Sequence, residues 1–281
     1  MCSILTLLHH GILTASLNLT WDTSLCADQS GWKGKRWLSS RVATKTTSTG
    51  PSTFFVAQEA GYKVEDFDYF IVNSVNQTFQ IPSLKGLGIP KDKIVALDQL
   101  GPLELETLVV PSAADQSGLI HNSVVSKLAK NLAGTPQAGS EPHQKLLISR
   151  DPKFGRTFEN YQELRTLLKG HGFIEVFLEH SSLQDQIDLF RSAKVIVSAH
   201  GAALTNLTYC EAGTSVHEIL DRDFAHQVYY MIAMAKGLDY TCQMASPNAP
   251  DLKTESHARS LEVDLRQIES FLVETESPST T

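Results

Sequence analysis

The stretch Val195-Ile-Val-Ser-Ala-His-Gly-Ala-Ala-Leu-Thr-Asn206 indicates the fold of this chain better than any other segment. It begins with a short apolar run, which is typical of a buried strand. Small residues follow at a turn, where the backbone can approach a ligand closely, and residues 204–209 are then expected to be helical. The free N–H groups at the start of such a helix attract anions. The same turn could also be purely structural, and both interpretations stay open.

Strands and helices are expected to alternate on both sides of this turn. The apolar runs that predict strands are residues 145–149, 174–178, 195–199, 215–220 and 240–243. The residues that predict an apolar stripe on one helix are Phe158, Tyr161, Leu164, Leu167 and Leu168. Ser182 and Asp185 have the spacing of a capping box before a second helix. This alternation is typical of a parallel α/β sheet, which binds ligands at the carboxyl ends of its strands.

A looser version of the alternation precedes residue 135. The expected strands are residues 67–72, 93–97 and 108–111, and the expected helices are residues 54–60, 81–87 and 119–132. Residues 133–144 contain two prolines and two glycines without an apolar period, and they predict a linker. The chain is therefore expected to comprise an irregular or disordered segment at 1–55, a partial Rossmann-like domain at 56–135 and a second Rossmann-like domain at 145–275.

The composition is that of a globular protein, and the net charge disfavours nucleic acid as a partner. Its 281 residues are 42% hydrophobic and 20% charged, and a formal net charge of −7 argues against nucleic acid, which favours basic proteins. The four cysteines have no zinc-ligand spacing, so free thiols in a reducing compartment are expected. The apolar run at residues 4–8 is too short to span a membrane and lacks a basic flank. No transmembrane segment and a cytoplasmic location are expected.

Two arginines follow the strand predicted at residues 145–149. Arg150 ends that strand, and Arg156 follows a Pro-Lys-Phe-Gly loop that should keep it near the same edge of the sheet. The forked guanidinium group suits the oxygens of a diphosphate. Both arginines are candidate anion-binding residues, although surface arginines without such a role are common.

Glu218 lies inside an otherwise apolar strand at residues 215–220. A charged side chain in that position must be paired or must reach a ligand. A carboxylate can accept both hydroxyls of a ribose, as it does in dinucleotide sites. Glu218 is therefore a candidate ribose-binding residue, with a structural salt bridge as the alternative.

Several other chemistries lack their motifs. Gly86 and Gly88 are followed by Ile-Pro, so the third glycine and the helix start of a dinucleotide fingerprint are missing. The sequence has no phosphate-binding P-loop and no Gly-x-Ser-x-Gly nucleophile elbow. Its histidines show no metal-ligand spacing, so no metal site is expected.

Several segments follow one another at a recognisable spacing: Ile148-Ser-Arg150, Arg156, Asn160, Gly172-Phe173, Leu183 with Gln186, and His200-Gly-Ala-Ala-Leu-Thr-Asn206. In order and spacing they resemble the motifs of glycosyltransferase family 61, which includes plant xylosyl- and arabinosyltransferases, the EGF-domain-specific O-GlcNAc transferase and bacterial members. Tyr161 departs from the family pattern, which usually has an acid there. Further upstream, Arg36-Trp37-Leu38 and Pro51 retain little of the segment that precedes the family's first half, so the first domain is expected to be incomplete.

The resemblance implies a GT-B architecture of two Rossmann-like domains with parallel sheets, with the acceptor side at 56–135 and the donor site at 145–275. It implies transfer from a UDP-sugar to a hydroxyl of a glycan or glycoprotein, with inversion, without a metal and without a cofactor. Arg150 and Arg156 would stabilise the leaving diphosphate, and the general base is not assigned. The implied donor-binding residues are Ser149, Arg150, Arg156, His200, Gly201, Ala202, Asn206 and Glu218.

Three alternatives follow from the resemblance and its departures. The chain could be a catalytically inactive sugar-nucleotide-binding remnant, because its first domain departs from the family pattern. It could instead be an unrelated α/β domain that binds another anion at the His-Gly-Ala turn. The lumen of the Golgi or endoplasmic reticulum is the alternative location, since eukaryotic members of the family act there.

Overall fold

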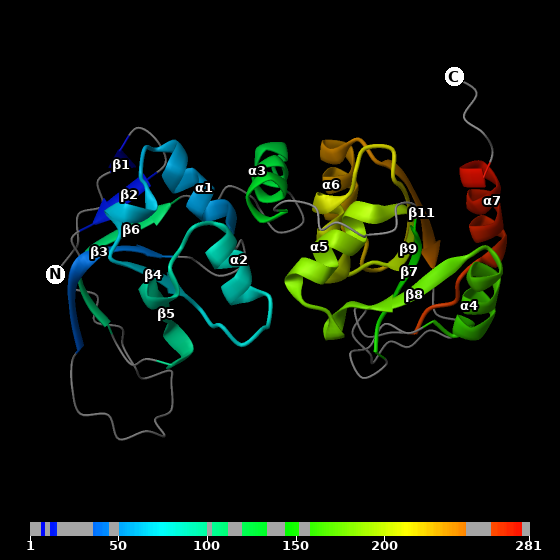
Figure 1. The fold of residues 1–281 in the computed structure, drawn as a ribbon, viewed down its shortest axis with the longest axis horizontal. Coiled ribbons are helices and arrows are strands. Elements are labelled where there is room, and N and C mark those ends of the chain that lie inside the picture. The colour runs from blue at the N-terminus through cyan, green and yellow to red at the C-terminus, as the bar shows by residue number, and fades with distance from the viewer. Residues whose placement is uncertain are drawn as a thin grey trace. The chain divides into compact units, whose positions relative to one another are not determined.

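The computed structural model describes residues 51–99, 103–111, 120–133, 144–151, 158–245 and 260–276, together with the strands at 7–8, 12–15 and 36–44. The chain divides into two compact units, Met1–Ser117 and Gly118–Thr281. Each unit contains one sheet, with helices packed on it (Figure 1). The fold is therefore α/β, as the alternation of apolar runs predicts.

The sheet of the second unit has five strands, and all of its pairs are parallel. Its order is β11-β10-β9-β7-β8. The strands are β7 (Gln144–Ser149), β8 (Phe173–Phe177), β9 (Ala193–Ala199), β10 (Ser215–Asp221) and β11 (Asp239–Ala245). Each lies within two residues of its predicted range, because the short apolar runs that predicted these strands are the segments that the sheet buries.

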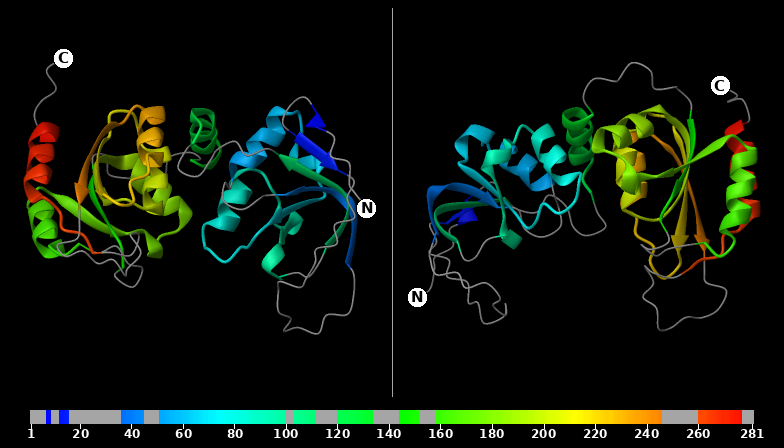
Figure 2. Two further views of the ribbon diagram at one scale, coloured as in Figure 1. Left: turned by 180° about the vertical axis from the view of Figure 1, so that it is seen from behind. Right: turned by 60° about the horizontal axis from the view of Figure 1, so that its bottom comes forward.

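Two helices cover one face of this sheet. They are α4 (Tyr161–Gly170) and α7 (Leu265–Glu276), which lie side by side in both views of Figure 2. Leu164 and Leu168 of α4 and Ile268 of α7 are fully buried against Leu147 and Val197 of the strands. The predicted apolar stripe on α4 is confirmed, since its i, i+4 spacing turns both leucines towards the sheet.

The other face carries α5 (Leu183–Ser192) and α6 (Val228–Lys236), on the opposite side from α4 and α7 in Figure 1. α5 begins with the predicted capping box. The Ser182 hydroxyl accepts from the backbone N–H of Asp185, whose carboxylate accepts from the N–H of Ser182. α6 ends at Gly237, where a φ of +67° favours glycine.

Helix α3 (Asn122–Leu132) belongs to the second unit. It packs against α6 and against η7 (Ala202–Tyr209), and buries Val125, Leu128 and Leu132. The sequence predicts this helix as part of the first domain, with the linker after it at 133–144. The boundary between units instead precedes α3, because the apolar face of the helix is covered by elements that follow it in the chain.

The sheet of the first unit has six strands in the order β1-β2-β6-β3-β4-β5. The strands are β1 (Leu7–Leu8), β2 (Ile12–Ala15), β3 (Arg36–Thr44), β4 (Tyr69–Val72), β5 (Ile94–Ala96) and β6 (Leu103–Pro111). β3, β4, β5 and β6 pair in parallel, whereas β1 and β2 pair antiparallel with each other and β2 pairs antiparallel with β6. The prediction of a purely parallel sheet for this domain is therefore wrong for the pairs β1–β2 and β2–β6, which are antiparallel.

Three of these strands lie in residues 1–55, which the sequence analysis expected to be irregular or disordered. β3 has few apolar residues and no clear alternation, so its sequence gives little strand signal. Its backbone pairs with β6 on one side and β4 on the other. Those partners lie far along the chain, and local sequence patterns do not reveal them.

Two described helices pack in this unit, α1 (Pro51–Glu59) and α2 (Gln80–Gly86). Aromatic rings of α1 and β4 form its core. Phe67 is fully buried between Tyr62 and Phe70, with ring centroids 5.4 Å and 5.3 Å away, and Phe54 of α1 meets Phe70 edge to face. Gly61 follows α1 with a φ of +92°, a conformation in which glycine is favoured at the end of a helix.

Candidate functional site

The carboxyl edge of the five-stranded sheet carries most of the predicted donor-binding residues. β7 and β9 are neighbouring parallel strands, and their register pairs Ile148 with Ser198. Arg150 and His200 each lie two residues after this pair, just beyond the ends of β7 and β9. The register therefore brings these two groups to the edge at which parallel α/β sheets bind ligands.

The two arginines of the predicted site differ in what the structure describes. Arg150 follows β7 directly and is partly exposed, and its guanidinium makes no ion pair with another residue in the described ranges. Arg156 lies outside the described residues, so its role stays a prediction.

Glu218 is fully buried in β10 and contacts two side chains from neighbouring strands. One carboxylate oxygen lies 2.5 Å from Nδ1 of His200, and the other accepts a hydrogen bond from the hydroxyl of Tyr240 in β11. From the sequence, this carboxylate is expected to meet a ribose or to form a structural salt bridge. In the structure Glu218 is fully buried and both of its oxygens contact protein side chains, as a structural role requires, and its contact with a ribose stays a prediction.

His200 is buried among aromatic rings as well as beside Glu218. Tyr229 of α6 lies closest, with ring centroids 4.9 Å apart, and Phe224 meets the imidazole edge to face at 5.9 Å. His226 stacks on it at 6.1 Å. These contacts fix the plane of the imidazole, and the negative faces of aromatic rings are favourable to a positive charge.

Tyr240 is held in the protonated form by its surroundings. Burial raises the pKa of its hydroxyl well above the ordinary value of 10, and the charge of Glu218 raises it further. Burial and the same carboxylate also raise the pKa of the Cys242 thiol, which lies on β11 next to this pair. Tyr240 is therefore the donor in its hydrogen bond with Glu218.

Ser149, at the end of β7, is held by a second hydrogen-bonded group. Its hydroxyl lies 2.7 Å from the hydroxyl of Tyr161, which donates to Glu175 of β8. Arg165 of α4 binds the other oxygen of Glu175 at 2.7 Å. Tyr161, which departs from the family pattern, thus orients the side chain at the end of this strand.

The segment after His200 is helical, as predicted, and forms the 3-10 helix η7. It starts at Gly201, which is buried, while Ala202 is exposed at the start of the helix. Asn206 is buried and donates to Oε1 of Gln186 and to the carbonyl of Ala203, at 3.0 Å and 3.1 Å. Asn206 therefore links η7 to α5 through Gln186. Both residues belong to the segments that resemble the family motifs.

Two polar side chains of this sheet have no role in the sequence-based prediction, Tyr240 near the start of β11 and Asp221 at the carboxyl edge. Asp221 ends β10, is 2% exposed, and accepts from the backbone N–H of Asp223 through one oxygen. Its other oxygen is buried without a hydrogen-bond partner among the described residues, so it can accept a hydroxyl of a ligand. In the sequence, only the position of Asp221 directly after the strand predicted at 215–220 indicates that it lies at the carboxyl edge.

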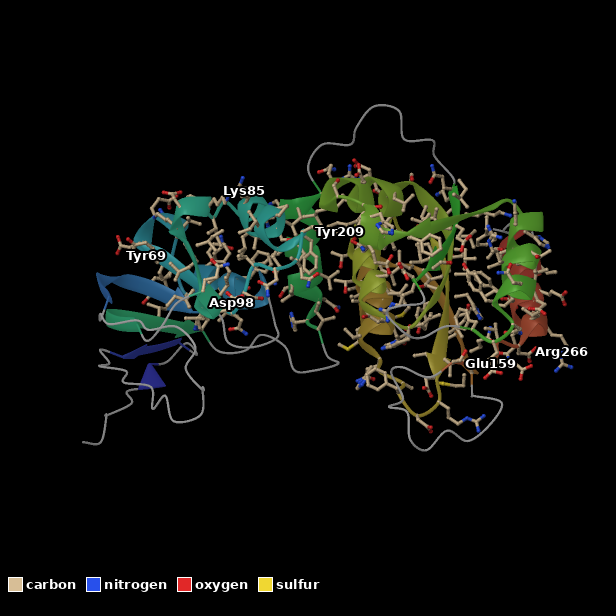
Figure 3. The ribbon with its side chains drawn as sticks, turned by 90° about the horizontal axis from the view of Figure 1, so that it is seen from below. Tyr69, Lys85, Asp98, Glu159, Tyr209 and Arg266 are labelled. Carbon is tan, nitrogen blue, oxygen red and sulfur yellow. The ribbon has the colours of Figure 1, made fainter. Side chains whose placement is uncertain are left out.

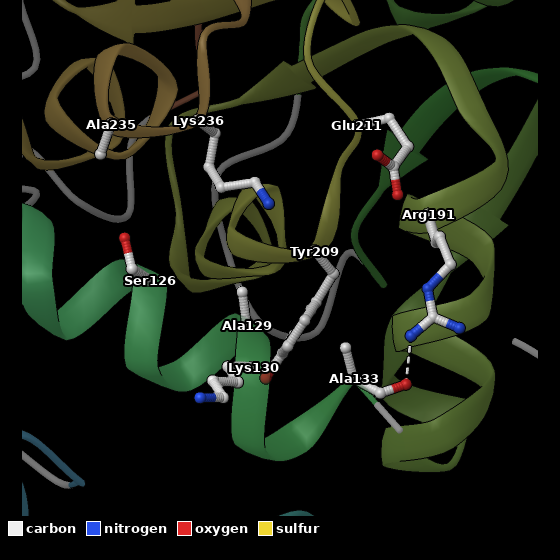
Figure 4. Close-up of a pocket in the computed structure, with 9 residues that line it drawn as sticks. All are labelled: Ser126, Ala129, Lys130, Ala133, Arg191, Tyr209, Glu211, Ala235 and Lys236. Atoms are coloured by element: carbon white, nitrogen blue, oxygen red, sulfur yellow. Dashed lines mark hydrogen bonds between the residues drawn. The ribbon is translucent and has the colours of Figure 1, made fainter. Parts of the chain in front are cut away.

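A cavity of about 530 Å³ lies elsewhere in the second unit (Figure 4). Arg191, Glu211 and Lys236 line it, and each precedes the start of a strand, so the cavity lies at the amino edge of the sheet. Tyr209 also lines it, and burial raises the pKa of its hydroxyl to about 12. None of the predicted donor-binding residues lines this cavity.

Labelled side chains mark the two ends of this unit in Figure 3. Figure 3 shows Tyr209 at the end that carries α3, and Glu159 and Arg266 at the end that carries α4 and α7. Within the described ranges, no group of three or more His, Cys, Asp or Glu side chains is arranged to hold a metal ion. Among the described helices, none has the length and apolar character needed to cross a membrane.

Comparison with known proteins agrees with the geometry. The family model described as Glycosyltransferase 61 matches residues 40–217, which is more than half of the chain. A beta-1,2-xylosyltransferase from Arabidopsis thaliana is 35% identical over 71 residues, which make up 25% of this chain and only 13% of that relative. Because this match covers more than half of the chain, the chain belongs to glycosyltransferase family 61.

Proposed function

We propose that this protein transfers a sugar from a UDP-sugar to a hydroxyl group of a glycan or glycoprotein. Family membership supports the reaction class. The register that sets Arg150 level with His200, at the carboxyl edge of a parallel sheet, supports a nucleotide diphosphate at that edge. The proposal includes a GT-B arrangement, in which the second unit binds the donor and the first contributes to the acceptor side.

The proposed reaction is an inverting displacement that needs no metal. A general base removes the proton of the acceptor hydroxyl, whose oxygen attacks the anomeric carbon from the face opposite UDP. The bond from that carbon to the diphosphate breaks, and negative charge grows on the departing oxygen. Arg150, with Arg156 as predicted, and the N–H groups at the start of η7 would stabilise this charge. The general base is not assigned to a residue.

A second candidate is a protein that binds the nucleotide sugar without transferring it. The sequence before residue 55 favours this candidate, since only Arg36-Trp37-Leu38 and Pro51 match the family's segment there. The donor site would be the same in both cases, so donor binding alone does not separate them.

Transfer and hydrolysis measured with a panel of UDP-sugars separate the two candidates. We expect one donor of the panel to be consumed in the presence of glycan or glycoprotein acceptors. UDP binding without consumption of any donor would instead favour the binding protein. Failure of UDP to bind at all, measured by calorimetry, would contradict both.

A further inference from the structure

Asp221 has one carboxylate oxygen without a partner in the part of the chain that the structure describes. Oδ1 accepts from the backbone N–H of Asp223 at 2.9 Å, which fixes the side chain. Oδ2 is buried and has no hydrogen-bond donor among the described residues. The residue as a whole is 2% exposed, so bulk water does not supply the missing donor. A buried acceptor without a donor is costly, and a ligand that brings the donor would compensate it.

The helices that follow the strands diverge between β7 and β9. β7 is followed by α4 on one face of the sheet, whereas β9 is followed by η7, which packs against α5 and α6 on the other face. Open parallel sheets bind ligands at the carboxyl ends of two such strands. The next strand after β9 in the sheet is β10, which ends at Asp221. Asp221 therefore lies one strand away from this switch point.

The register sets Asp221 level with the turn after β9. Ile219 pairs with Ala199, and Asp221 and Gly201 each lie two residues further along. Gly201 has no side chain, which suits a close approach of the backbone to a ligand. Arg150 and Asp221 lie at the ends of β7 and β10, which are two inter-strand spacings, about 10 Å, apart. A nucleotide is long enough to contact both, with its diphosphate at Arg150 and its ribose at Asp221.

We propose that Asp221 binds the ribose of the nucleotide donor through Oδ2, so that the nucleotide lies across Gly201 from β7 to β10. This inference rests on the proposed function, because it needs a nucleotide diphosphate at Arg150. A ribose hydroxyl donates to Oδ2, while the hydrogen bond from Asp223 holds the carboxylate in place. Glu218, the ribose-binding candidate of the sequence, differs from Asp221 because both of its oxygens already contact protein side chains.

The test combines a change in the protein with a matching change in the ligand. Calorimetry on the full chain compares UDP with dideoxy-UDP, which keeps the base and the diphosphate but lacks both ribose hydroxyls. The variants are Glu218→Gln and Asp221→Asn, of which the second keeps an acceptor for the N–H of Asp223. Asp239→Asn is the control, because it makes the same replacement at an exposed position where β11 begins, at the opposite edge of the sheet. Thermal unfolding shows that each variant is folded.

We expect wild type to bind UDP about tenfold more tightly than dideoxy-UDP, since a hydrogen bond to a charged group is missing in the second complex. Asp221→Asn should lower the affinity for UDP about tenfold and leave the affinity for dideoxy-UDP nearly unchanged. The reason is that the amide nitrogen in place of Oδ2 is a donor and does not accept the hydroxyl. The preference for UDP then disappears in this variant, as a direct contact requires. Asp239→Asn should keep the preference.

Other outcomes with these variants overturn the inference. Equal losses for both ligands in Asp221→Asn would make the residue part of the scaffold, and unchanged affinities would leave Oδ2 to an ordered water. A preference that is lost in Glu218→Gln and kept in Asp221→Asn would assign the ribose to Glu218. If Asp221→Asn does not fold, Asp221→Ser takes its place, because a serine hydroxyl can accept from the N–H of Asp223 and brings no second oxygen.

These outcomes are distinct from failure of the proposed function. Wild-type protein that binds neither UDP nor dideoxy-UDP would contradict the nucleotide site itself. Wild-type protein that binds the two ligands with equal affinity would overturn only the role of Asp221, whatever the variants show.

Discussion

His217, which precedes Glu218 in β10, should set the acid limit of the donor-binding unit. It is 3% exposed, and burial lowers its pKa from the ordinary 6.5 to about 4. Oε1 of Gln243 accepts from the backbone N–H of Asp264, so the amide group of Gln243 donates to Nε2 of His217. Nδ1 then carries the proton and lies 2.9 Å from the Thr241 hydroxyl. A second proton on the ring would face the Gln243 amide donor, so the neutral form is the one that fits.

The expected effect follows from proton linkage. Because the folded-state pKa is depressed, the unfolded chain binds more protons between pH 6.5 and about 4. The contribution of His217 to the unfolding free energy is therefore constant above pH 6.5 and falls as the pH drops below 6.5. The loss amounts to about 2 kcal/mol at pH 5 and about 3 kcal/mol at pH 4, from about 1.4 kcal/mol per unit.

The assay is urea denaturation of wild type and His217→Gln at several pH values from 7.5 to 5. The variant lacks the titrating group, so its deficit relative to wild type should shrink by about 2 kcal/mol over this range. The difference in unfolding free energy between wild type and variant is taken at each pH, so that the contributions of the carboxylates and of the other histidines cancel. His180→Gln, at an exposed position of the same unit, is the control for replacement of a surface histidine. Parallel curves for wild type and His217→Gln would refute the buried neutral histidine.

Three further predictions concern the ligand site and the core. Arg150→Ala should weaken UDP far more than uridine, with partial rescue by Lys, and equal losses in calorimetry would make Arg150 part of the scaffold. UDP affinity should be the same in EDTA as in Mg²⁺, and a requirement for the metal would contradict metal-independent binding. Leu168→Ala should cost about 2–5 kcal/mol of unfolding free energy in urea, because Leu168 is fully buried in the α4 face of the core, and a loss below 1 kcal/mol would contradict that packing.

The sequence by itself determined the elements of the second unit. Apolar runs and the helical stripe around Leu164 predicted its strands and α4, and Ser182 with Asp185 predicted the start of α5. These features are local, since each depends on residues within one or two turns or within one strand. The motif at residues 195–206 also marked the carboxyl edge of the sheet, because a strand followed by small residues and a helix has one orientation in a parallel α/β unit.

Only the tertiary structure decided which residues meet. Glu218 binds side chains 18 and 22 residues away on two neighbouring strands, so its partners depend on strand order and register. α3 joins the second unit because its apolar face is covered by elements later in the chain, and β3 becomes a strand because β4 and β6 pair with it. Local patterns show that a side chain must be buried, but its partner comes from long-range pairing. From the sequence, Glu218 could be either a ribose-binding carboxylate or one half of a structural pair, and only the structure shows that it contacts His200 and Tyr240.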